Sequence, residues 1–441
     1  MKTTVRVGCG AGFAGDRLEP ALVLAEHGAL DYLVLECLGE RTVALAQLRR
    51  LHDPEAGYDP MLERRMDGLL PAIKRNGIRL VTNMGAANPA AAAARIAAMA
   101  KRKGLALKVA AVLGDDVLDR LDGVAPCLET GAPLRSFGAL VSANTYLGVD
   151  AVLPALQQDV DVIVTGRAAD PSLFLAPLVH EFGWRLDDYD RLARGTVVGH
   201  LLECGGQLTG GYYADPGAKD VPGLANLGFP FADVDSDGNA RFAKVKGTGG
   251  IINRATATEQ LLYEVTDPFG YETPDVTADF STAELNDLGH DVVTVSGARG
   301  KPRPQRLKVS VGHRAGFLGE GEIGYAGENC VARAELGGDI VRERLANRFP
   351  EIRVDVIGMT SLHRQPLGRD AYRPYEARLR VTARSADRDT ARLVGEEVEA
   401  LFTNGPAGGG GVRKATVEQV GIVSCLVPRD SVKTEILVFE A

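Results

Sequence analysis

The chain has 441 residues, of which 45% are hydrophobic and 24% charged, so it can bury a large core without disulfides or metals to stabilise it. The formal charge of -8 is spread over interspersed acids and bases, which argues against a nucleic-acid surface, because phosphate contacts need a concentrated basic face. No apolar run reaches the roughly 18 residues of a membrane span, and the six cysteines show no paired spacing. We therefore expect a cytoplasmic protein with reduced thiols that acts on small molecules, without nucleic-acid or membrane partners.

Short β-branched runs alternate with helical stretches from Thr3 to Thr165. The predicted strands are Thr3–Gly8, Tyr32–Glu36, Arg79–Thr82, Lys108–Leu113, Leu140–Ser142 and Val162–Thr165. The predicted helices include Pro20–His27, Arg41–Leu51, Pro60–Lys74 and Pro89–Lys103. Nearly continuous hydrophobic strands separated by helices are typical of a parallel sheet that is covered on both faces. The predicted fold class is α/β, with a mostly parallel sheet covered by helices in Rossmann-like layers.

The pattern changes in the second half of the chain. From about residue 261 to residue 327, alternating segments such as DVVTVSG and RLKVSVG predict a β-rich segment. A helix is then expected over Asp339–Phe349, and the pattern continues as strand, strand, helix and strand. Those four elements are Ile352–Gly358, Tyr375–Ala383, Asp389–Phe402 and Val417–Cys425. This order predicts a small C-terminal α+β domain.

Polar or small residues follow each predicted strand of the first half. They are Cys9–Gly15, Glu36 with Cys37, Asn83–Gly85, Gly114–Asp116, Asn144 with Thr145, and Gly166 with Arg167. In open α/β sheets the ligand crevice lies beyond the carboxyl ends of the strands. Gly and Asn also suit ordinary turns, so only their convergence on one edge predicts a site. We take Glu36 as an acid/base candidate, Gly12 as a substrate-binding candidate, and Asn83 and Asn144 as groups that polarise a substrate oxygen.

The first loop contains a literal GxGxxG, Gly10–Gly15, and Glu36 follows at the spacing of a ribose-binding acid. In a dinucleotide site the third glycine lies in the first turn of a helix that faces the pyrophosphate. Pro20 instead predicts that the helix begins near Glu19 or Pro20, which leaves a longer loop. Asp16 and Glu19 would also place negative charge where a pyrophosphate binds. An NAD cofactor is therefore disfavoured.

A second segment of interest is Thr165–Ser172, where a strand ends and a helix begins. Asp170 or Ser172 can cap that helix and Pro171 suits its first turn, which is an ordinary structural role. Arg167 is not explained in that way. Its planar guanidinium suits a carboxylate or a phosphate, so we predict substrate binding by Arg167 and Asp170.

A third segment is Gly199–Gln207. If it is helical, His200 and Glu203 share one face, which suits a base with its orienting carboxylate or a metal ligand pair. A buried structural histidine is the commoner outcome of such a pattern. Without a second nearby histidine we expect no bound metal, and Cys204 lacks a visible partner for nucleophilic chemistry. The catalytic candidates are Glu36, His200 and Glu203.

Two further features have ordinary alternatives. The basic residues between Arg299 and Lys308 form either a solvated loop or a dock for an anionic substrate. The glycine-rich stretch Asn404–Lys414 either wraps a pyrophosphate or forms a surface loop, and we favour the loop.

Long blocks of this sequence resemble the acyclic terpene utilisation protein A family. The blocks include VGCGAGFAGDRLEPALVLAEHGALDYLVLECLGERTVALAQ, DPEAGYDPMLERRM, VTNMGAANP, VTGRAADPSLFLAPLVHEFGW, GTVVGHLLECGGQLTGGY, KGTGGII, GARGKPRP and GEIGYAG. The tail, with FTNGPAGGGG and VSCLVPR, is similar to the family's C-terminal domain. The resemblance implies a family N-terminal α/β domain over residues 1–345, including the β-rich 261–327, and a C-terminal α+β domain over residues 346–441.

The family is named for gene clusters that break down citronellol and geraniol, alongside acyl-CoA carboxylases, hydratases and lyases. The resemblance therefore implies catabolism, and our first hypothesis is a lyase or hydratase that acts on a branched or hydroxylated acyl substrate, with coenzyme A as a carrier. The second is a non-catalytic partner subunit of an acyl-CoA carboxylase or lyase. The third is an NAD-dependent oxidoreductase. We expect a homo-oligomer, and a small companion subunit is an open alternative.

Overall fold

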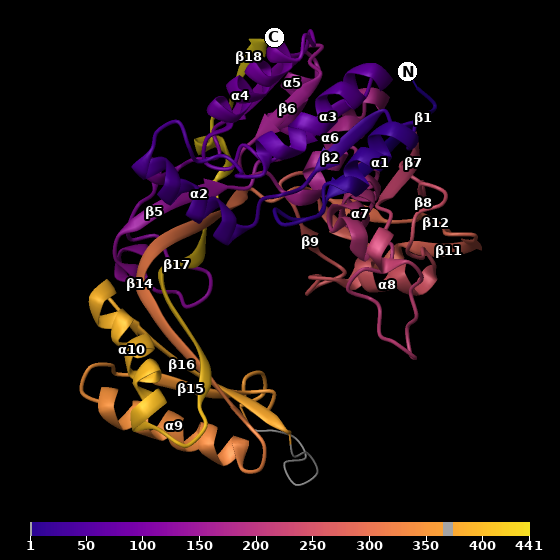
Figure 1. Cartoon of the computed structure of the whole chain (residues 1–441). Coiled ribbons are helices and arrows are strands. Elements are labelled where there is room, and N and C mark those ends of the chain that lie inside the picture. Colours follow the sequence, from indigo (N-terminus) through magenta and orange to yellow (C-terminus); the bar gives the residue numbers. More distant parts are fainter. Residues whose placement is uncertain (1, 365–373) are drawn as a thin grey trace. The chain divides into compact units, whose positions relative to one another are not determined.

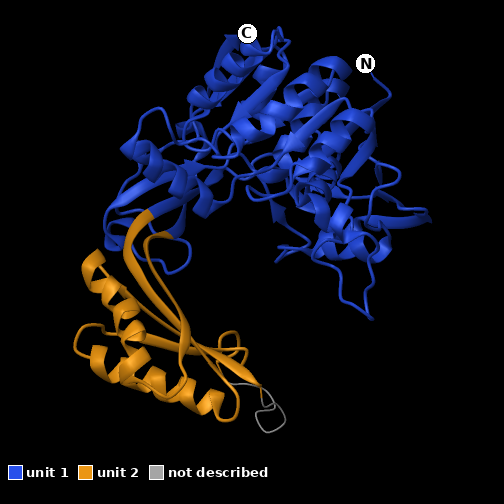
Figure 2. Cartoon of the chain, viewed as in Figure 1, with its two compact units in different colours: residues 1–312, 422–441 blue, residues 313–421 orange. Residues whose placement is uncertain are grey.

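The computed structural model describes residues 2–364 and 374–441 (Figure 1). Two compact units divide the chain, one made of residues 1–312 and 422–441, and the other of residues 313–421 (Figure 2). The sequence instead predicts a single division between residues 345 and 346. The difference arises because two long strands, β14 (Arg306–Ala326) and β17 (Gly410–Pro428), each contribute residues to both units.

The first unit is built on a ten-stranded sheet. Its strands, in sheet order, are β11 (Glu284–Gly289), β12 (Val292–Ser296), β8 (Ala240–Lys244), β7 (Pro230–Asp235), β1 (Thr4–Ala11), β2 (Tyr32–Leu35), β3 (Arg79–Thr82), β6 (Val162–Thr165), β4 (Lys108–Leu113) and β18 (Glu435–Glu440). The neighbours from β1 to β4 pair in parallel. All the other neighbours pair antiparallel. The sheet is therefore mixed, and the prediction of a mostly parallel sheet is wrong.

Helices cover both faces of the parallel part, as the sequence predicts (Figure 1). On one face are α1 (Glu19–His27), α3 (Leu62–Asn76) and α4 (Pro89–Arg102), and on the other are α5 (Val149–Leu156), α6 (Asp170–Phe182) and α7 (Tyr189–Glu203). Two more helices, α2 (Glu40–His52) and α8 (Arg254–Leu262), belong to the same unit. Buried side chains such as Leu24 and Met66 on the first face, and Phe174 and Val197 on the second, form two apolar cores. These cores hold the strand ends in fixed positions.

Strand β5 (Leu140–Thr145) lies outside the ten-stranded sheet, although the sequence predicts it there. It pairs instead with β14. A small buried cluster that includes Leu134, Val309 and Cys425 packs beside this pair. In the ten-stranded sheet, β6 takes the position between β3 and β4.

The predicted β-rich stretch 261–327 does hold strands, but it does not form a unit of its own. Strands β9 (Tyr271–Glu272), β10 (Thr277–Asp279) and β13 (Arg299–Lys301) form a three-stranded sheet. Strands β11 and β12 extend the ten-stranded sheet through the hairpin strands β7 and β8. Hairpins need only short connections, which explains why this end of the sheet is antiparallel.

The second unit is a small α+β domain, as predicted. Its elements follow the order β14, α9 (Cys330–Leu345), β15 (Ile352–Ile357), β16 (Glu376–Ser385), α10 (Arg388–Asn404), β17, and the sheet order is β15-β16-β14-β17. This is the split βαβ arrangement. Helix α9 begins at Cys330, well before the predicted Asp339. Gly337 and Gly338 therefore lie inside the helix. A Cβ at Gly338 would lie 2.4 Å from Val354 Cγ1, so these glycines let the helix approach the sheet closely.

In the part of the chain that the structure describes, no helix combines the length and the apolar character that crossing a lipid bilayer requires.

Candidate functional site

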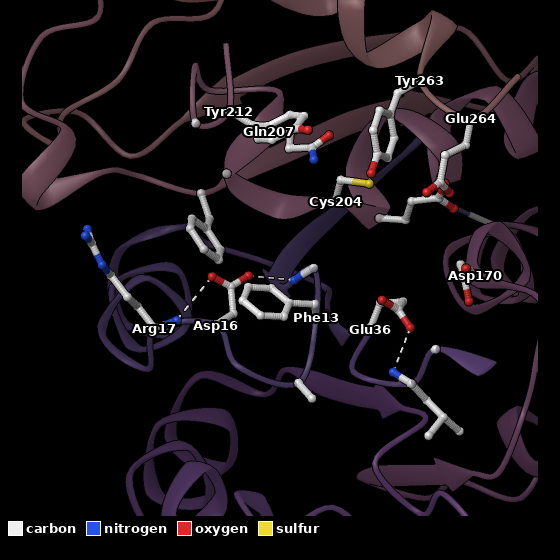
Figure 3. Close-up of a pocket in the computed structure, with 18 of the residues that line it drawn as sticks. Phe13, Asp16, Arg17, Glu36, Asp170, Cys204, Gln207, Tyr212, Tyr263 and Glu264 are labelled. Carbon is white, nitrogen blue, oxygen red and sulfur yellow. Dashed lines mark hydrogen bonds between the residues drawn. The ribbon is translucent and has the colours of Figure 1, made fainter. Parts of the chain in front are cut away.

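A cavity of about 730 Å³ lies in the first unit, at the carboxyl ends of β1, β2 and β6 (Figure 3). Its wall comes from the segments 12–17, 36–42, 167–170, 203–212, 224–229 and 263–264. Five of the residues chosen from the sequence line it, namely Gly12, Glu36, Arg167, Asp170 and Glu203. The parallel strand ends therefore bring most of the predicted residues together, as expected for an open α/β sheet.

Glu36 directly follows β2 and lines the cavity. Its side chain is 8% exposed. Its Oε1 accepts hydrogen bonds from the Leu38 amide at 2.9 Å and from Asn83 Nδ2 at 2.8 Å. Burial is the main cause that raises the pKa of Glu36 to about 8, and the negative charge of Asp170 adds to it, whereas Arg167 opposes it. Near pH 7 the carboxyl is mostly protonated. Because Oε1 accepts two N–H groups, Oε2 is the oxygen left to carry a proton.

Arg167 is 2% exposed and its guanidinium forms part of the cavity wall. Its Nη1 donates to the Leu38 carbonyl oxygen and, at 2.9 Å, to Asp170 Oδ1. The guanidinium carbon lies 4.1 Å from the centre of the Tyr146 ring, within cation–π range. Nη1 of Arg167 is thus directed at the protein, whereas Nε is buried without a hydrogen-bond partner in the described chain. Its charge compensates the carboxylates around it.

Glu40 stands in the first turn of α2 and also lines the cavity. Partial burial alone would raise its pKa, but Arg167 and a hydrogen bond from the Tyr146 hydroxyl lower the pKa to about 2. Lys308 lies 3.5 Å from the same carboxylate. The pKa of Glu40 is therefore lowered, whereas the pKa of Glu36, on the same wall, is raised.

His200 and Glu203 form a buried pair on α7, as the i, i+3 spacing predicts. The sequence suggested a histidine base with an orienting carboxylate behind it, but the carboxylate is the member that faces the cavity. His200 is 1% exposed and does not reach the cavity, whereas Glu203 lines it. His200 Nδ1 lies 2.8 Å from Glu203 Oε1, and the rings of Tyr271 and Phe280 pack against the imidazole. Burial raises the pKa of Glu203 to about 7, and the neighbouring His200 partly offsets this rise. The carboxyl is the member of the pair that lines the cavity, and the histidine contacts it from behind.

Cys204 follows this pair and also lines the cavity. Burial, and then the Glu203 carboxyl, raise the pKa of its thiol far above the ordinary value. A nucleophilic cysteine needs a thiolate, and positive neighbours usually provide it. The acid-rich surroundings of Cys204 do the reverse, so its thiol remains neutral.

Asn83 and Asn144 lie behind the wall. Asn83 is fully buried, donates to Glu36 and accepts from the Cys37 amide at 2.7 Å. Asn144 donates to Asp115 Oδ2 at 2.8 Å, and the same oxygen accepts the Arg167 amide at 2.8 Å. Both amides are therefore placed to hold wall residues rather than a substrate oxygen.

The first loop does not have the geometry of a dinucleotide site. Strand β1 continues through Gly10 to Ala11, and α1 begins at Glu19, which confirms the late helix start predicted from Pro20. The Asp16 carboxylate accepts the amides of Gly12 and Arg17, at 2.8 and 3.1 Å. Figure 3 shows both bonds. The N–H groups that would bind a phosphate are thus used by a carboxylate of the chain itself.

Gly12 also has a packing role that predicts a measurable effect. A Cβ at Gly12 would lie 2.4 Å from the Cys204 carbonyl carbon, so either the loop or the end of α7 would have to move. We expect Gly12→Ala to lower the free energy of unfolding by about 1–3 kcal/mol. The measurement is urea unfolding followed by the fluorescence of Trp184, the single tryptophan, which is buried in the first unit.

Gly39→Ala is the matched control for this measurement. Gly39 lines the same cavity, but the nearest atom to an added Cβ is Thr42 Oγ1 at 3.9 Å, and its φ of -88° suits alanine. The control should change stability by less than about 0.5 kcal/mol. Equal losses in both variants would contradict a specific packing role for Gly12.

The residues of the two remaining sequence features do not line the cavity. The basic residues 299–308 are dispersed, since Arg303 pairs with Asp150 and Arg306 donates to the Leu426 carbonyl, while Lys308 approaches Glu40. In the glycine-rich stretch, β17 begins at Gly410 and Lys414 pairs with Glu399. Within residues 2–364 and 374–441, no group of three or more His, Cys, Asp or Glu side chains is arranged to hold a metal ion.

Several residues of the wall were not identified from the sequence. Glu40 follows the same strand end as Glu36, but an acid in a first helical turn has an ordinary explanation. Tyr263 and Glu264 come from a distant segment, and Glu264 has a φ of 59° that no local pattern announces. Asp115 does not line the cavity itself but accepts the Arg167 amide; it follows β4 and was noted only as part of a turn.

Comparison with known proteins identifies the family. A model of the family described as "Acyclic terpene utilisation family protein AtuA" matches residues 5–438, as the sequence blocks predict. No curated protein matches. Among solved structures, a de novo designed protein, Foldit4, matches 23% of this chain and 97% of its own at 16% identity, with a TM-score of 0.17 that carries no argument. The family match covers nearly the whole chain and implies a role in acyclic terpene utilisation. The chain therefore belongs to the acyclic terpene utilisation family, AtuA.

Proposed function

We propose that the protein is a hydratase or hydro-lyase that adds water to, or removes it from, a branched or hydroxylated acyl substrate. The observation that carries the proposal is the position of Glu36. It lines a cavity large enough for a small organic substrate, and two N–H donors hold its Oε1, which leaves Oε2 to carry a proton. A positioned, protonated carboxyl is the general acid that the loss of a hydroxyl group requires.

The other residues take roles that follow from their contacts. Glu203, with a pKa of about 7, is the general base, and His200 behind it is a positioning residue. Asn83 holds the general acid in place, and Arg167 keeps Glu40 ionised so that the wall does not accumulate protons. Coenzyme A enters this proposal as the carrier of the acyl group. Its phosphates would stay outside the cavity, because carboxyl groups predominate on the wall.

The experiment is water exchange. The full chain is incubated with branched β-hydroxyacyl thioesters, or with their unsaturated counterparts, in isotopically labelled water, and incorporation of the labelled oxygen is followed by mass spectrometry. Label should enter the substrate with the parent chain and not with Glu36→Gln. A panel that binds, as seen by calorimetry, but exchanges no oxygen would overturn the proposal and favour the non-catalytic partner subunit. That alternative also predicts lasting co-purification with a carboxylase or lyase.

The two carboxyl groups predict a pH profile. The base works only when Glu203 has lost its proton, so activity falls as the pH drops below about 7. The acid works only while Glu36 is protonated, so activity falls as the pH rises above about 8. We expect a bell-shaped plot of kcat/KM with its maximum between these values.

Asn83→Ala tests the assignment of the alkaline limb. The Asn83 amide lowers the pKa of Glu36, so its removal should raise that pKa and move the alkaline limb to higher pH, while the acid limb stays. An alkaline limb that does not move would assign it to another group.

A further inference from the structure

Acidic side chains outnumber basic ones on the cavity wall. Six carboxyl groups line the cavity against two arginines, and neither lysine nor histidine is among the lining residues; the carboxyl groups are those of Asp16, Glu36, Glu40, Asp170, Glu203 and Glu264. Glu203 is 7% exposed, and its Oε2 is buried without a hydrogen-bond partner in the described chain. An acceptor in that state is normally satisfied by water or by a bound group.

Few donors offset these acids. Nη1 of Arg167 donates to Leu38 and Asp170, and its Nε is buried without a hydrogen-bond partner in the described chain. The exposed Arg17 donates to two backbone carbonyls in the stretch 224–225, and the Gly12 amide bonds to Asp16. The ionised Glu40 stands in the first turn of α2. A negative charge that developed on a substrate oxygen would therefore have one buried arginine as a partner and would lie beside several carboxyl groups.

Aromatic rings make up much of the rest of the wall. Phe13, Tyr212, Phe229 and Tyr263 line the cavity, and Figure 3 labels Phe13, Tyr212 and Tyr263. Tyr212 is 89% exposed, has a φ of 62° and lies edge-on to Tyr263, with ring centres 6.4 Å apart. A large, exposed ring on strained backbone at a cavity mouth indicates a functional constraint. The faces of aromatic rings attract cations.

We infer that this cavity stabilises positive charge on the substrate, so that proton transfer comes first and the reacting carbon is a branched one. The inference rests on the proposed function. An enolate route would place negative charge on the acyl oxygen, beside the carboxyl groups of the wall. The acid-rich, aromatic wall favours the route through a carbocation, which a tertiary carbon supports best.

In this route the bonds of the substrate break and form in a fixed order. The Oε2–H of Glu36 protonates the hydroxyl of a tertiary alcohol. The C–O bond then breaks, its electron pair leaves with water, and a tertiary cation remains among the carboxylates and rings. The electrons of a neighbouring C–H bond form the double bond, and its proton passes to Glu203. Hydration is the reverse, with water supplying the oxygen to the cation.

The test compares three probes with one carbon skeleton by calorimetry on the full chain near pH 7: a branched tertiary ammonium, the tertiary alcohol and the carboxylate. The ammonium should bind at least about tenfold more tightly than the alcohol, and the carboxylate most weakly. Glu264→Gln and Tyr263→Leu should each reduce this preference. Glu26→Gln, which removes an exposed carboxylate on α1 outside the cavity, should not.

The outcomes separate the inference from the proposed function. A carboxylate or an alcohol that binds as tightly as the ammonium would overturn the inference, even if labelled oxygen is exchanged. If the ammonium binds most tightly but no labelled oxygen is exchanged, the cavity does favour positive charge, and the proposed hydratase activity is wrong. Exchange together with an ammonium preference that Glu264→Gln weakens would support both.

Discussion

Glu36→Gln is expected to lower kcat by about 10²–10⁴-fold while it preserves the fold. The amide oxygen of glutamine can still accept the bonds that Glu36 Oε1 receives from Leu38 and Asn83, at 2.9 and 2.8 Å. Its NH₂ group would take the place of the protonated Oε2. The amide has no transferable proton, so the loss would be chemical rather than structural. The measurement is the initial rate of labelled-oxygen exchange at saturating substrate.

Two companions make this result interpretable. Glu36→Asp keeps an acid but withdraws it by one methylene group, so its loss should be smaller, on the order of 10²-fold or less. Glu63→Gln removes an exposed carboxylate that pairs with Arg95 on the covering helices and should leave kcat unchanged. If Glu36→Gln retained more than about a tenth of the parent rate, another group would have to supply the proton.

The same variant has an effect on stability with a defined sign. In the folded chain Glu36 keeps its proton up to about pH 8, whereas in the unfolded chain it releases the proton near its ordinary pKa of 4.5. The folded state therefore loses stability as the pH rises between these two values. Glutamine removes this cost. Glu36→Gln should be more stable than the parent at pH 8 and similar to it at pH 4, as measured by Trp184 fluorescence.

Arg167→Met is expected to destabilise the first unit by about 3–5 kcal/mol, because it leaves buried acceptors and a carboxylate without their partner. The Leu38 carbonyl and Asp170 lose their donor, and Glu40 loses the charge that holds its pKa near 2. The loss should be greater at pH 8 than at pH 4, since the freed carboxyl groups can take up protons at low pH. Urea unfolding followed by Trp184 fluorescence reports this unit alone.

Lys308→Met is the matched control. Lys308 also faces Glu40 and lies 5.0 Å from the centre of the Tyr146 ring, but its side chain is 45% exposed. Removal of this exposed charge should cost less than about 1 kcal/mol. If both variants lost the same free energy, burial of Arg167 would not be the source of its effect.

The sequence was sufficient to predict the parallel strands and their helices, because local patterns determine them. The apolar runs of β3, β4 and β6 coincide with the predicted strands, and Pro20 located the start of α1. The strand ends then brought Glu36 and Arg167 to one cavity, as the topology of parallel strands requires.

What the sequence could not give depends on contacts between distant segments. Nothing local shows that β5 pairs with β14, or that hairpins extend the sheet beyond β1. The order of His200 and Glu203 relative to the cavity depends on the rotation of α7 against Tyr271 and Phe280. The spacing of that pair was therefore predictable, but not which member faces the substrate.

The position of β18 has a consequence for synthesis. β18 pairs along β4 and closes that edge of the sheet, yet it follows the whole of the second unit in the chain. A ribosome that adds about 5–20 residues per second would need on the order of tens of seconds to pass from β4 to β18. During that time the apolar segment KVAAVL presents an unpaired strand edge, on which other nascent chains can add. A strand made long after β4 is thus the one that protects this edge of the sheet from aggregation.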